Sequence, residues 1–190
     1  GFSGYFFSIN RGKKSISIDF RQEEGRELFR RLSEKADVVL ENFTPGTMDR
    51  LGVGYETLKE RNPGLIFCSI SCFGQTGPYR DRPALDIVVQ GMGGVLSITG
   101  EKGGPPVRPG ASYGDLTAGL YATIGILSAL HERDRSGLGQ AIDLSMLDCQ
   151  VAVLENAYMR YSVTGKAPEP LGTRHPSATP FQAFPTSDGY

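Results

Sequence analysis

Two oxygen-bearing side chains that could attack an acyl group lie close together in the sequence. Ser112 stands in Gly110-Ala-Ser-Tyr-Gly114, which has the G-x-S-x-G spacing, and Asp115 follows three residues later. A serine needs a neighbouring base to become a nucleophile, and only His131 and His175 are present. A carboxylate needs only to be ionised and accessible. The elements around each group decide between them.

Asp115 precedes fifteen uncharged residues, 116–130, in which Leu and Ile alternate with small residues. Because apolar and small residues fall on every face, this stretch predicts a buried helix surrounded by protein. The first turn of such a helix has unpaired N–H groups and a positive dipole end, which favour a carboxylate. Asp115 is therefore either a simple N-cap or a carboxylate presented to a ligand, and composition leaves both interpretations open.

The serine alternative is the weaker one. A G-x-S-x-G nucleophile requires a strand that runs directly into the turn, whereas residues 103–109 before Ser112 are rich in Gly and Pro. Asp148 is a rival carboxylate, but Ser145-Met-Leu-Asp148 has the spacing of a capping box, which explains it structurally.

The composition excludes several classes of function. The 190 residues contain 20 basic and 21 acidic side chains, so no global charge points to nucleic acid or an anionic membrane. Three cysteines and two histidines show neither disulfide nor zinc spacing, so we expect no metal and a reducing compartment, cytoplasmic or mitochondrial. The chain begins at Gly1 without a signal or transit segment, which suggests processing or excision from a longer protein. The apolar run is too short to span a bilayer, so we expect a soluble protein.

The first half of the chain alternates strands and helices. We expect extended segments at 6–10 and 15–20, helices at 23–36 and 55–61, a short helix near Met48, and strands at 37–42 and 65–70. This order predicts a parallel sheet with helices on its faces. Ligands of such sheets bind beyond the carboxyl ends of the strands, which places residues 41–44 and 71–77 at a candidate site.

The second half continues the pattern and then changes. We expect a helix within 84–98 that bends at Gly93-Gly94, a loop at 100–110, a strand at 140–144 and a long helix at 146–162. From Thr164 the chain is irregular and rich in Pro. The prediction is an α/β domain over residues 1–163, followed by a linker and the start of a second, smaller domain over 164–190.

Five dispersed motifs then occur in order along the chain: Asn10-Arg-Gly-Lys-Lys-Ser15, Glu41-Asn-Phe-Thr-Pro-Gly46, Asp49-Arg-Leu-Gly52, Phe73-Gly-Gln-Thr-Gly-Pro78 and Gly114-Asp115. In these motifs and their spacing the chain resembles the class III CoA-transferases, the formyl-CoA and carnitine CoA-transferase family. The resemblance runs almost from end to end. Relative to the family, the chain lacks the first strand and everything beyond the beginning of the small domain.

The resemblance implies a doubly wound, Rossmann-like CoA-binding domain and a homodimer that is interlocked at full length. It implies acyl-CoA and a small carboxylic acid as substrates, with no tightly bound cofactor. Asp115 falls on the family's catalytic aspartate. The implied CoA contacts are Asn42, Phe43 and Arg50, with Ile18 and Arg21 as further positions and Arg82 near another.

The family chemistry that the resemblance implies is covalent. The aspartate attacks a thioester to give an acyl-aspartyl anhydride, and CoA thiolate then gives an aspartyl-CoA thioester. The similar α-methylacyl-CoA racemases pair this aspartate with a histidine, but Leu85 stands at that place here and carries no proton. A racemase, a Ser112 hydrolase and a CoA-binding module without catalysis remain the alternatives. Residues 172–175 and 179–184 hint at relatives that act on dicarboxylates.

Overall fold

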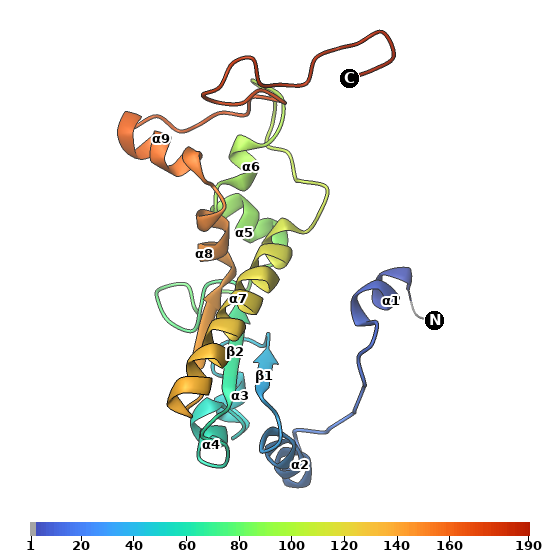
Figure 1. Ribbon diagram of the computed structural model, residues 1–190, viewed down its shortest axis with the longest axis vertical. Coiled ribbons are helices and arrows are strands. Elements are labelled where there is room, and N and C mark those ends of the chain that lie inside the picture. Colours follow the sequence, from blue (N-terminus) through green and yellow to red (C-terminus); the bar gives the residue numbers. More distant parts are fainter. Residues whose placement is uncertain (1–2) are drawn as a thin grey trace.

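A small parallel sheet forms the centre of the chain. The computed structural model describes residues 3–190 and contains three strands, β1 (Val38–Glu41), β2 (Ile66–Ser71) and β3 (Ala141–Ser145), in the order β1-β2-β3 (Figure 1). Both pairs are parallel, with Val38 opposite Ile66 and Phe67 opposite Ala141. Because parallel strands need crossover connections, helices join each strand to the next.

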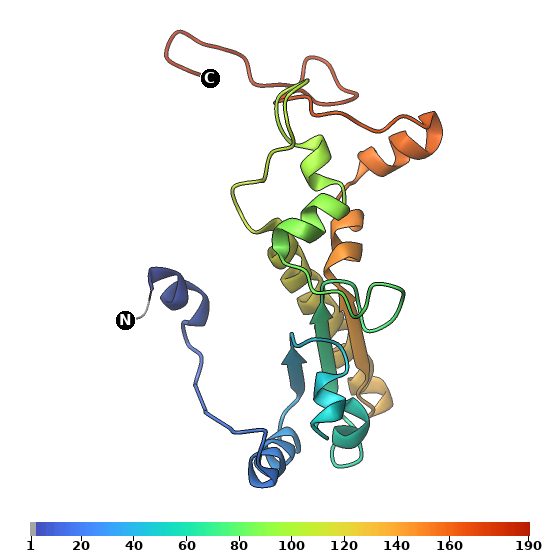
Figure 2. The same cartoon turned by 180° about the vertical axis from the view of Figure 1, so that it is seen from behind.

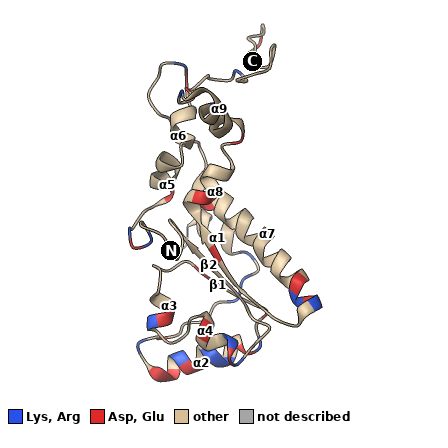
Figure 3. Cartoon of the chain, turned by 90° about the vertical axis from the view of Figure 1, so that its left-hand side faces the viewer, with Lys and Arg blue, Asp and Glu red and all other residues tan. Residues whose placement is uncertain are grey.

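One face of the sheet packs against the helix that precedes β1 and the two helices between β1 and β2. These helices are α2 (Glu23–Ser33), α3 (Thr47–Arg50) and α4 (Tyr55–Lys59). The Leu58 cluster lies there and consists of five buried residues: Met48, Val53, Leu58, Leu65 and Phe67. Figure 3 shows many charged residues on α2, whose Arg30 pairs with Glu23 at 2.7 Å. The helix is therefore amphipathic, as its sequence predicts.

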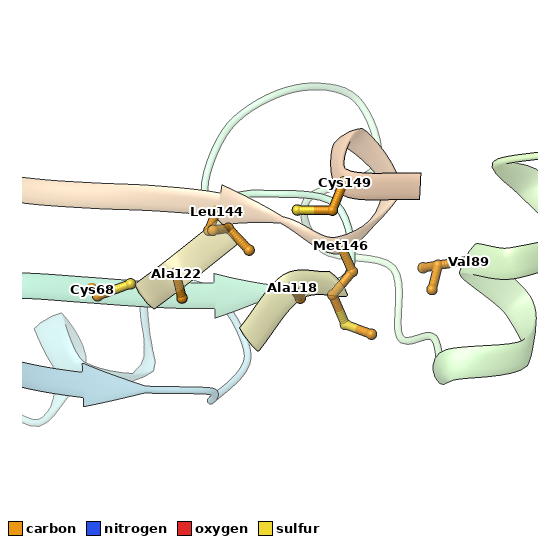
Figure 4. Close-up of a cluster of buried hydrophobic side chains, with 7 residues drawn as sticks. All are labelled: Cys68, Val89, Ala118, Ala122, Leu144, Met146 and Cys149. Carbon is orange, nitrogen blue, oxygen red and sulfur yellow. The ribbon is translucent and has the colours of Figure 1, made fainter. Parts of the chain in front are cut away.

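The long helix α7 (Tyr113–Ser136) covers the opposite face. The Cys68 cluster lies between α7, the sheet and α5, and Figure 4 shows its seven buried residues: Cys68, Val89, Ala118, Ala122, Leu144, Met146 and Cys149. Successive residues of a strand point to opposite faces, so the neighbours Phe67 and Cys68 belong to different clusters. β2 is thus buried on both sides.

Four further helices extend beyond the carboxyl ends of the strands. They are α5 (Asp86–Met92), α6 (Val95–Ile98), α8 (Met146–Ala152) and α9 (Asn156–Thr164). The expected bend at Gly93-Gly94 separates α5 from α6. The Ser145 Oγ accepts a hydrogen bond from the Asp148 N–H at 3.2 Å, which confirms the N-cap predicted for α8.

Two predictions of local structure are wrong. Residues 4–10 form a helix, α1 (Gly4–Asn10), because the Ser3 Oγ accepts a hydrogen bond from the Phe6 N–H at 3.1 Å and caps the turn. Residues 15–20 form no strand, since no partner strand lies beside them in the described part of the chain. Figures 1 and 2 show α1 apart from the sheet at the end of an extended segment.

The predicted long helix at 146–162 is divided. α8 ends at Ala152, and α9 begins after Glu155, whose φ of 53° is in the left-handed region and turns the chain. Residues 165–190 contain no helix, and their one sheet-like pairing is an isolated bridge between Thr186 and Gly189. The domain boundary at 163 stays a prediction.

The prediction that α7 is buried on every face is also wrong within the described residues. Its small residues Ala118, Ala122 and Ala129 face the sheet and are at most 3% exposed. Leu120 on the other side is 65% exposed, and Leu127 is 60% exposed. The three strands provide one packing surface for α7, and nothing in residues 3–190 covers its outer face.

Candidate functional site

Asp115 lies in the first turn of α7 with its side chain exposed. It is not the N-cap, because α7 begins two residues earlier and Ser112 occupies the cap position. The acceptor for the first N–H groups comes from another helix. Asp86 Oδ1 accepts hydrogen bonds from Gly114 N at 2.8 Å and from Asp115 N at 3.3 Å. The Asp115 carboxylate is therefore not needed to cap its own helix.

The surroundings of Asp115 raise its pKa above the ordinary value. Partial burial is the main cause, and the negative charge of Asp86 adds to it, because both disfavour a second carboxylate. The nearby guanidinium of Arg108 acts in the opposite direction. The balance makes Asp115 a more basic carboxylate than an isolated aspartate.

A cavity of about 220 Å³ opens at the carboxyl ends of β1 and β2. Three of the predicted CoA contacts, Asn42, Phe43 and Arg82, line it together. Asn42 Nδ2 donates a hydrogen bond to the Ile70 carbonyl at 2.7 Å, which ties the end of β1 to the end of β2. The Arg82 guanidinium lies over the Tyr79 ring, 4.1 Å from its centroid. The Arg82 guanidinium, the Asn42 amide and the Phe43 ring thus lie on the wall of one cavity.

Cys72 connects this cavity to Asp115. Its side chain lines the cavity, and its Sγ donates a hydrogen bond to the Ala84 carbonyl at 3.2 Å. Burial raises the pKa of the Cys72 thiol, and the charge of Asp115 raises it further. Ala84 lines the same cavity and stands two residues before Asp86, whose Oδ1 accepts the hydrogen bond from the Asp115 N–H.

The other predicted contacts lie outside this cavity. Arg50 is exposed on α3 and donates to Thr47 Oγ1 at 2.8 Å, close in sequence to Phe43. Arg21 is 88% exposed and makes paired hydrogen bonds to Asp19 at 2.9 and 3.0 Å. Ile18 is half-buried on the same segment. The structure therefore gathers three of the six predicted contacts and leaves three apart.

The geometry argues against the hydrolase alternative. His131 follows Ser112 by about five helical turns on α7, which corresponds to roughly 27 Å. The His175 Nδ1 accepts hydrogen bonds from Ser177 N at 3.2 Å and Ala178 N at 2.9 Å, and its ring stacks on Phe181. Ser112 Oγ is bonded to Arg108 instead, at 3.2 Å. Neither histidine is placed to act as its base.

Two groups at the site were missed by sequence reasoning. Asp86 has no local signal, because its partners on α7 are 28 and 29 residues away. Ser71 Oγ is buried without a hydrogen-bond partner, and its residue lines the cavity beside Cys72. The alternation of β2 could have indicated that the Ser71 hydroxyl is buried at the end of the strand. It could not have indicated that this hydroxyl lacks a hydrogen-bond partner.

Comparison with known proteins identifies the family. The model of CoA-transferase family III matches residues 1–190, the whole chain. The chain belongs to this family. No helix within residues 3–190 is long and apolar enough to cross a membrane. The same residues contain no cluster of three or more His, Cys, Asp or Glu side chains that could hold a metal ion.

Relatives in family III carry transferase names. The chain is 49% identical to an acetyl-CoA:oxalate CoA-transferase from Acetobacter aceti, over 97% of this chain and 48% of that protein. It is 46% identical to a succinate–glutarate CoA-transferase from Agrobacterium fabrum, over 99% of this chain and 47% of that protein. The chain thus spans about half the length of these curated relatives.

A solved structure of a similar protein has the same fold. A CaiB/BaiF family protein from Brucella suis matches with a TM-score of 0.91 and 50% identity, over 99% of this chain and 50% of that one. The mixed α/β architecture is therefore that of the CaiB/BaiF proteins. The doubly wound arrangement of a larger sheet stays a prediction.

Proposed function

We propose that this chain carries the nucleophile and part of the coenzyme A site of an enzyme that transfers CoA from an acyl-CoA to a free carboxylic acid. The observation that carries the proposal is the position of Asp115. It is exposed in the first turn of α7, and its N–H donates to Asp86, two residues after Ala84, which lines the cavity shared by Asn42, Phe43 and Arg82. A basic carboxylate next to a cation-lined cavity suits attack on a thioester.

The reaction divides into four balanced steps. An Asp115 oxygen bonds to the thioester carbonyl carbon, the C–S bond breaks, and CoA leaves as thiolate. The thiolate then attacks the Asp115 carbonyl of the anhydride and releases the donor acid, which leaves an aspartyl-CoA thioester. The acceptor carboxylate attacks this thioester and again expels thiolate. The thiolate finally attacks the acceptor carbonyl, which forms the new acyl-CoA and restores Asp115.

The cavity residues have properties that suit CoA. The Arg82 guanidinium can bind a phosphate with two parallel hydrogen bonds. Asn42 uses one amide hydrogen on Ile70 and keeps its other hydrogen and its oxygen for a ligand. Phe43 is 48% exposed and offers an apolar surface. Arg50, Arg21 and Ile18 would join the CoA site from outside this cavity.

The proposed acids follow from the names of the relatives. Their names include oxalate, succinate and glutarate, so we propose a small dicarboxylic acid as acceptor or donor. Two carboxylates of such an acid suit a transferase, since one reacts while the other is recognised. We also propose the doubly wound CoA domain and the interlocked homodimer for the full-length protein.

The test uses the full-length protein with succinyl-CoA and a panel of free acids, with CoA esters separated by chromatography. Wild-type protein is expected to form the new ester, and Asp115→Ala and Asp115→Asn to lose about 10³-fold or more of the rate. Hydroxylamine should convert Asp115 to its hydroxamate during turnover, as seen by peptide mass spectrometry. Asp134→Asn, at the exposed far end of α7, is the matched control. Exchange that persists in both Asp115 variants removes the proposal.

A further inference from the structure

Asp86 makes an unusual number of contacts for a single carboxylate at the start of a short helix. Its side chain is only 14% exposed. Oδ1 accepts from the N–H groups of Gly114 and Asp115, and Oδ2 accepts from Gln90 Nε2 at 2.7 Å. The Arg108 guanidinium lies 3.7 Å from Oδ2. One acid on α5 thereby links its own helix, the first turn of α7 and the loop before it.

Gly114 allows this contact to form. A Cβ at residue 114 would lie 2.9 Å from Asp86 Oδ1 and 2.9 Å from Val89 Cγ2, which is closer than side chains normally approach. The absence of a side chain therefore brings the first turn of α7 directly onto α5. The hydrogen bonds to Asp86 hold the first turn of α7 in place, and this turn cannot move away from α5 without breaking them.

We propose that Asp86 is a positioning residue that fixes the first turn of α7 and thereby the direction in which Asp115 presents its carboxylate. The inference rests on the proposed role of Asp115 as nucleophile. Asp86 does not need to touch the substrate, because it acts through the peptide N–H groups of Gly114 and Asp115.

The charge of Asp86 adds a second effect. The charged groups that act on Asp115 are Asp86 from α5 and Arg108 from the preceding loop, and Asp115 in turn acts on the Cys72 thiol, which follows β2. After burial, the charge of Asp86 is the largest cause that raises the pKa of Asp115. Acylation converts Asp115 from a carboxylate to an uncharged anhydride, so the repulsion between the two acids is relieved as the covalent intermediate forms.

Two substitutions separate position from charge. In Asp86→Asn the amide oxygen can still accept from Gly114 and Asp115. Gln90 can turn to offer its Oε1, which is buried without a partner, to the new amide group. Asp86→Ala removes both the charge and the acceptor. The pair therefore distinguishes loss of repulsion from loss of the contact to α7.

The experiment measures the pH dependence of kcat/KM in the full-length protein. Asp86→Asn should move the acidic limb to lower pH, because the ionised form of Asp115 is no longer repelled, and should lower the plateau about tenfold. Asp86→Ala should lower kcat about 100-fold or more, with a smaller change in the KM for acyl-CoA. In the same variant, the amides of residues 114 and 115 should exchange faster with deuterium. Gly114→Ala, which displaces the Asp86 carboxylate, should also lower kcat.

Ser145→Ala is the structural control. It removes the N-cap of α8, so it should lower the melting temperature without moving the pH limb. A wild-type pH profile and kcat in both Asp86→Asn and Gly114→Ala would overturn the inference even if Asp115→Ala is inactive. Exchange that persists in Asp115→Ala would instead overturn the proposed function. If Asp86→Ala does not fold, the other two variants still decide.

Discussion

Arg133 Nη2 lies 2.9 Å from Asp37 Oδ1, and Arg133 Nη1 donates to the Gly64 carbonyl at 3.2 Å. Asp37 immediately precedes β1, and Gly64 lies two residues before β2. The C-terminal turn of α7 is thereby fastened to the start of the sheet, and α7 runs antiparallel to the strands. Its first turn, with Asp115, must then lie beyond their carboxyl ends, where parallel sheets bind ligands.

Removing Arg108 should shift the pH dependence in the direction opposite to Asp86→Asn. Arg108 lowers the pKa of Asp115, so Arg108→Met should raise this pKa. If the ionised form of Asp115 is the nucleophile, the acidic limb of kcat/KM should move to higher pH. Arg135→Met, an exposed arginine in the last turn of α7, should leave the profile unchanged. If the acidic limb of kcat/KM moved to lower pH in Arg108→Met, Arg108 would not lower the pKa of Asp115.

Arg82 is expected to contribute to acyl-CoA binding more than to catalysis. Arg82→Ala should raise the KM for acyl-CoA about tenfold, because a charge-assisted hydrogen bond to phosphate is lost, and should change kcat little. Arg82→Lys should recover part of the loss, since it keeps the charge. Steady-state kinetics at low and high salt would check this, with Arg135→Ala as the control. An unchanged KM would remove Arg82 from the CoA site.

Cys72 reports on the charge of Asp115. Burial and then Asp115 raise the pKa of its thiol, so little thiolate is present near neutral pH. Asp115→Asn should lower that pKa and accelerate alkylation of Cys72 by iodoacetamide, measured peptide by peptide with mass spectrometry. Asp134→Asn should have no such effect. Equal rates in wild type and Asp115→Asn would mean that the two side chains are not neighbours.

Gly139 is expected to be intolerant of any side chain. A Cβ there would collide with the Leu65 carbonyl oxygen, where the chain enters β3 beside β2. Gly139→Ala should lower the free energy of unfolding by about 1–3 kcal/mol, as overpacking does. At Gly110 a Cβ would meet nothing within 4 Å, so Gly110→Ala should change stability by about 0.5 kcal/mol or less. Urea denaturation would compare the two, and equal stabilities would refute the close approach.

Regular elements were predictable where local pattern is sufficient. The strands at 38–41, 66–71 and 141–145 and helix α2 lie within about two residues of their predicted bounds at most ends. Residues 15–20 show the same period-two alternation as a strand, yet they have no partner to pair with. Alternation describes one face of a segment and carries no information about what lies beside it.

The candidate site was predictable only in part, for a related reason. Asp115, Asn42 and Phe43 stand in sequence motifs, and Arg82 follows one of them closely, so all four could be named in advance. Asp86 could not, because its function depends on how α5 and α7 approach at Gly114, and such tertiary contacts leave no periodic signal. The burial of α7 was overestimated because an uncharged sequence shows what a helix can bury and not how many neighbours it has.

The Leu58 and Cys68 clusters, on opposite faces of β2, should respond differently to stabilising substitutions. Stabilising substitutions around Leu58 would lie on the face of the sheet opposite α7, the helix that bears the nucleophile. Substitutions around Cys68 would bend α7 or shift its first turn, so a gain in stability there would come at the expense of the catalytic rate. Substitutions meant to raise the melting temperature should therefore be tried first in the Leu58 cluster, which packs against α3 and α4.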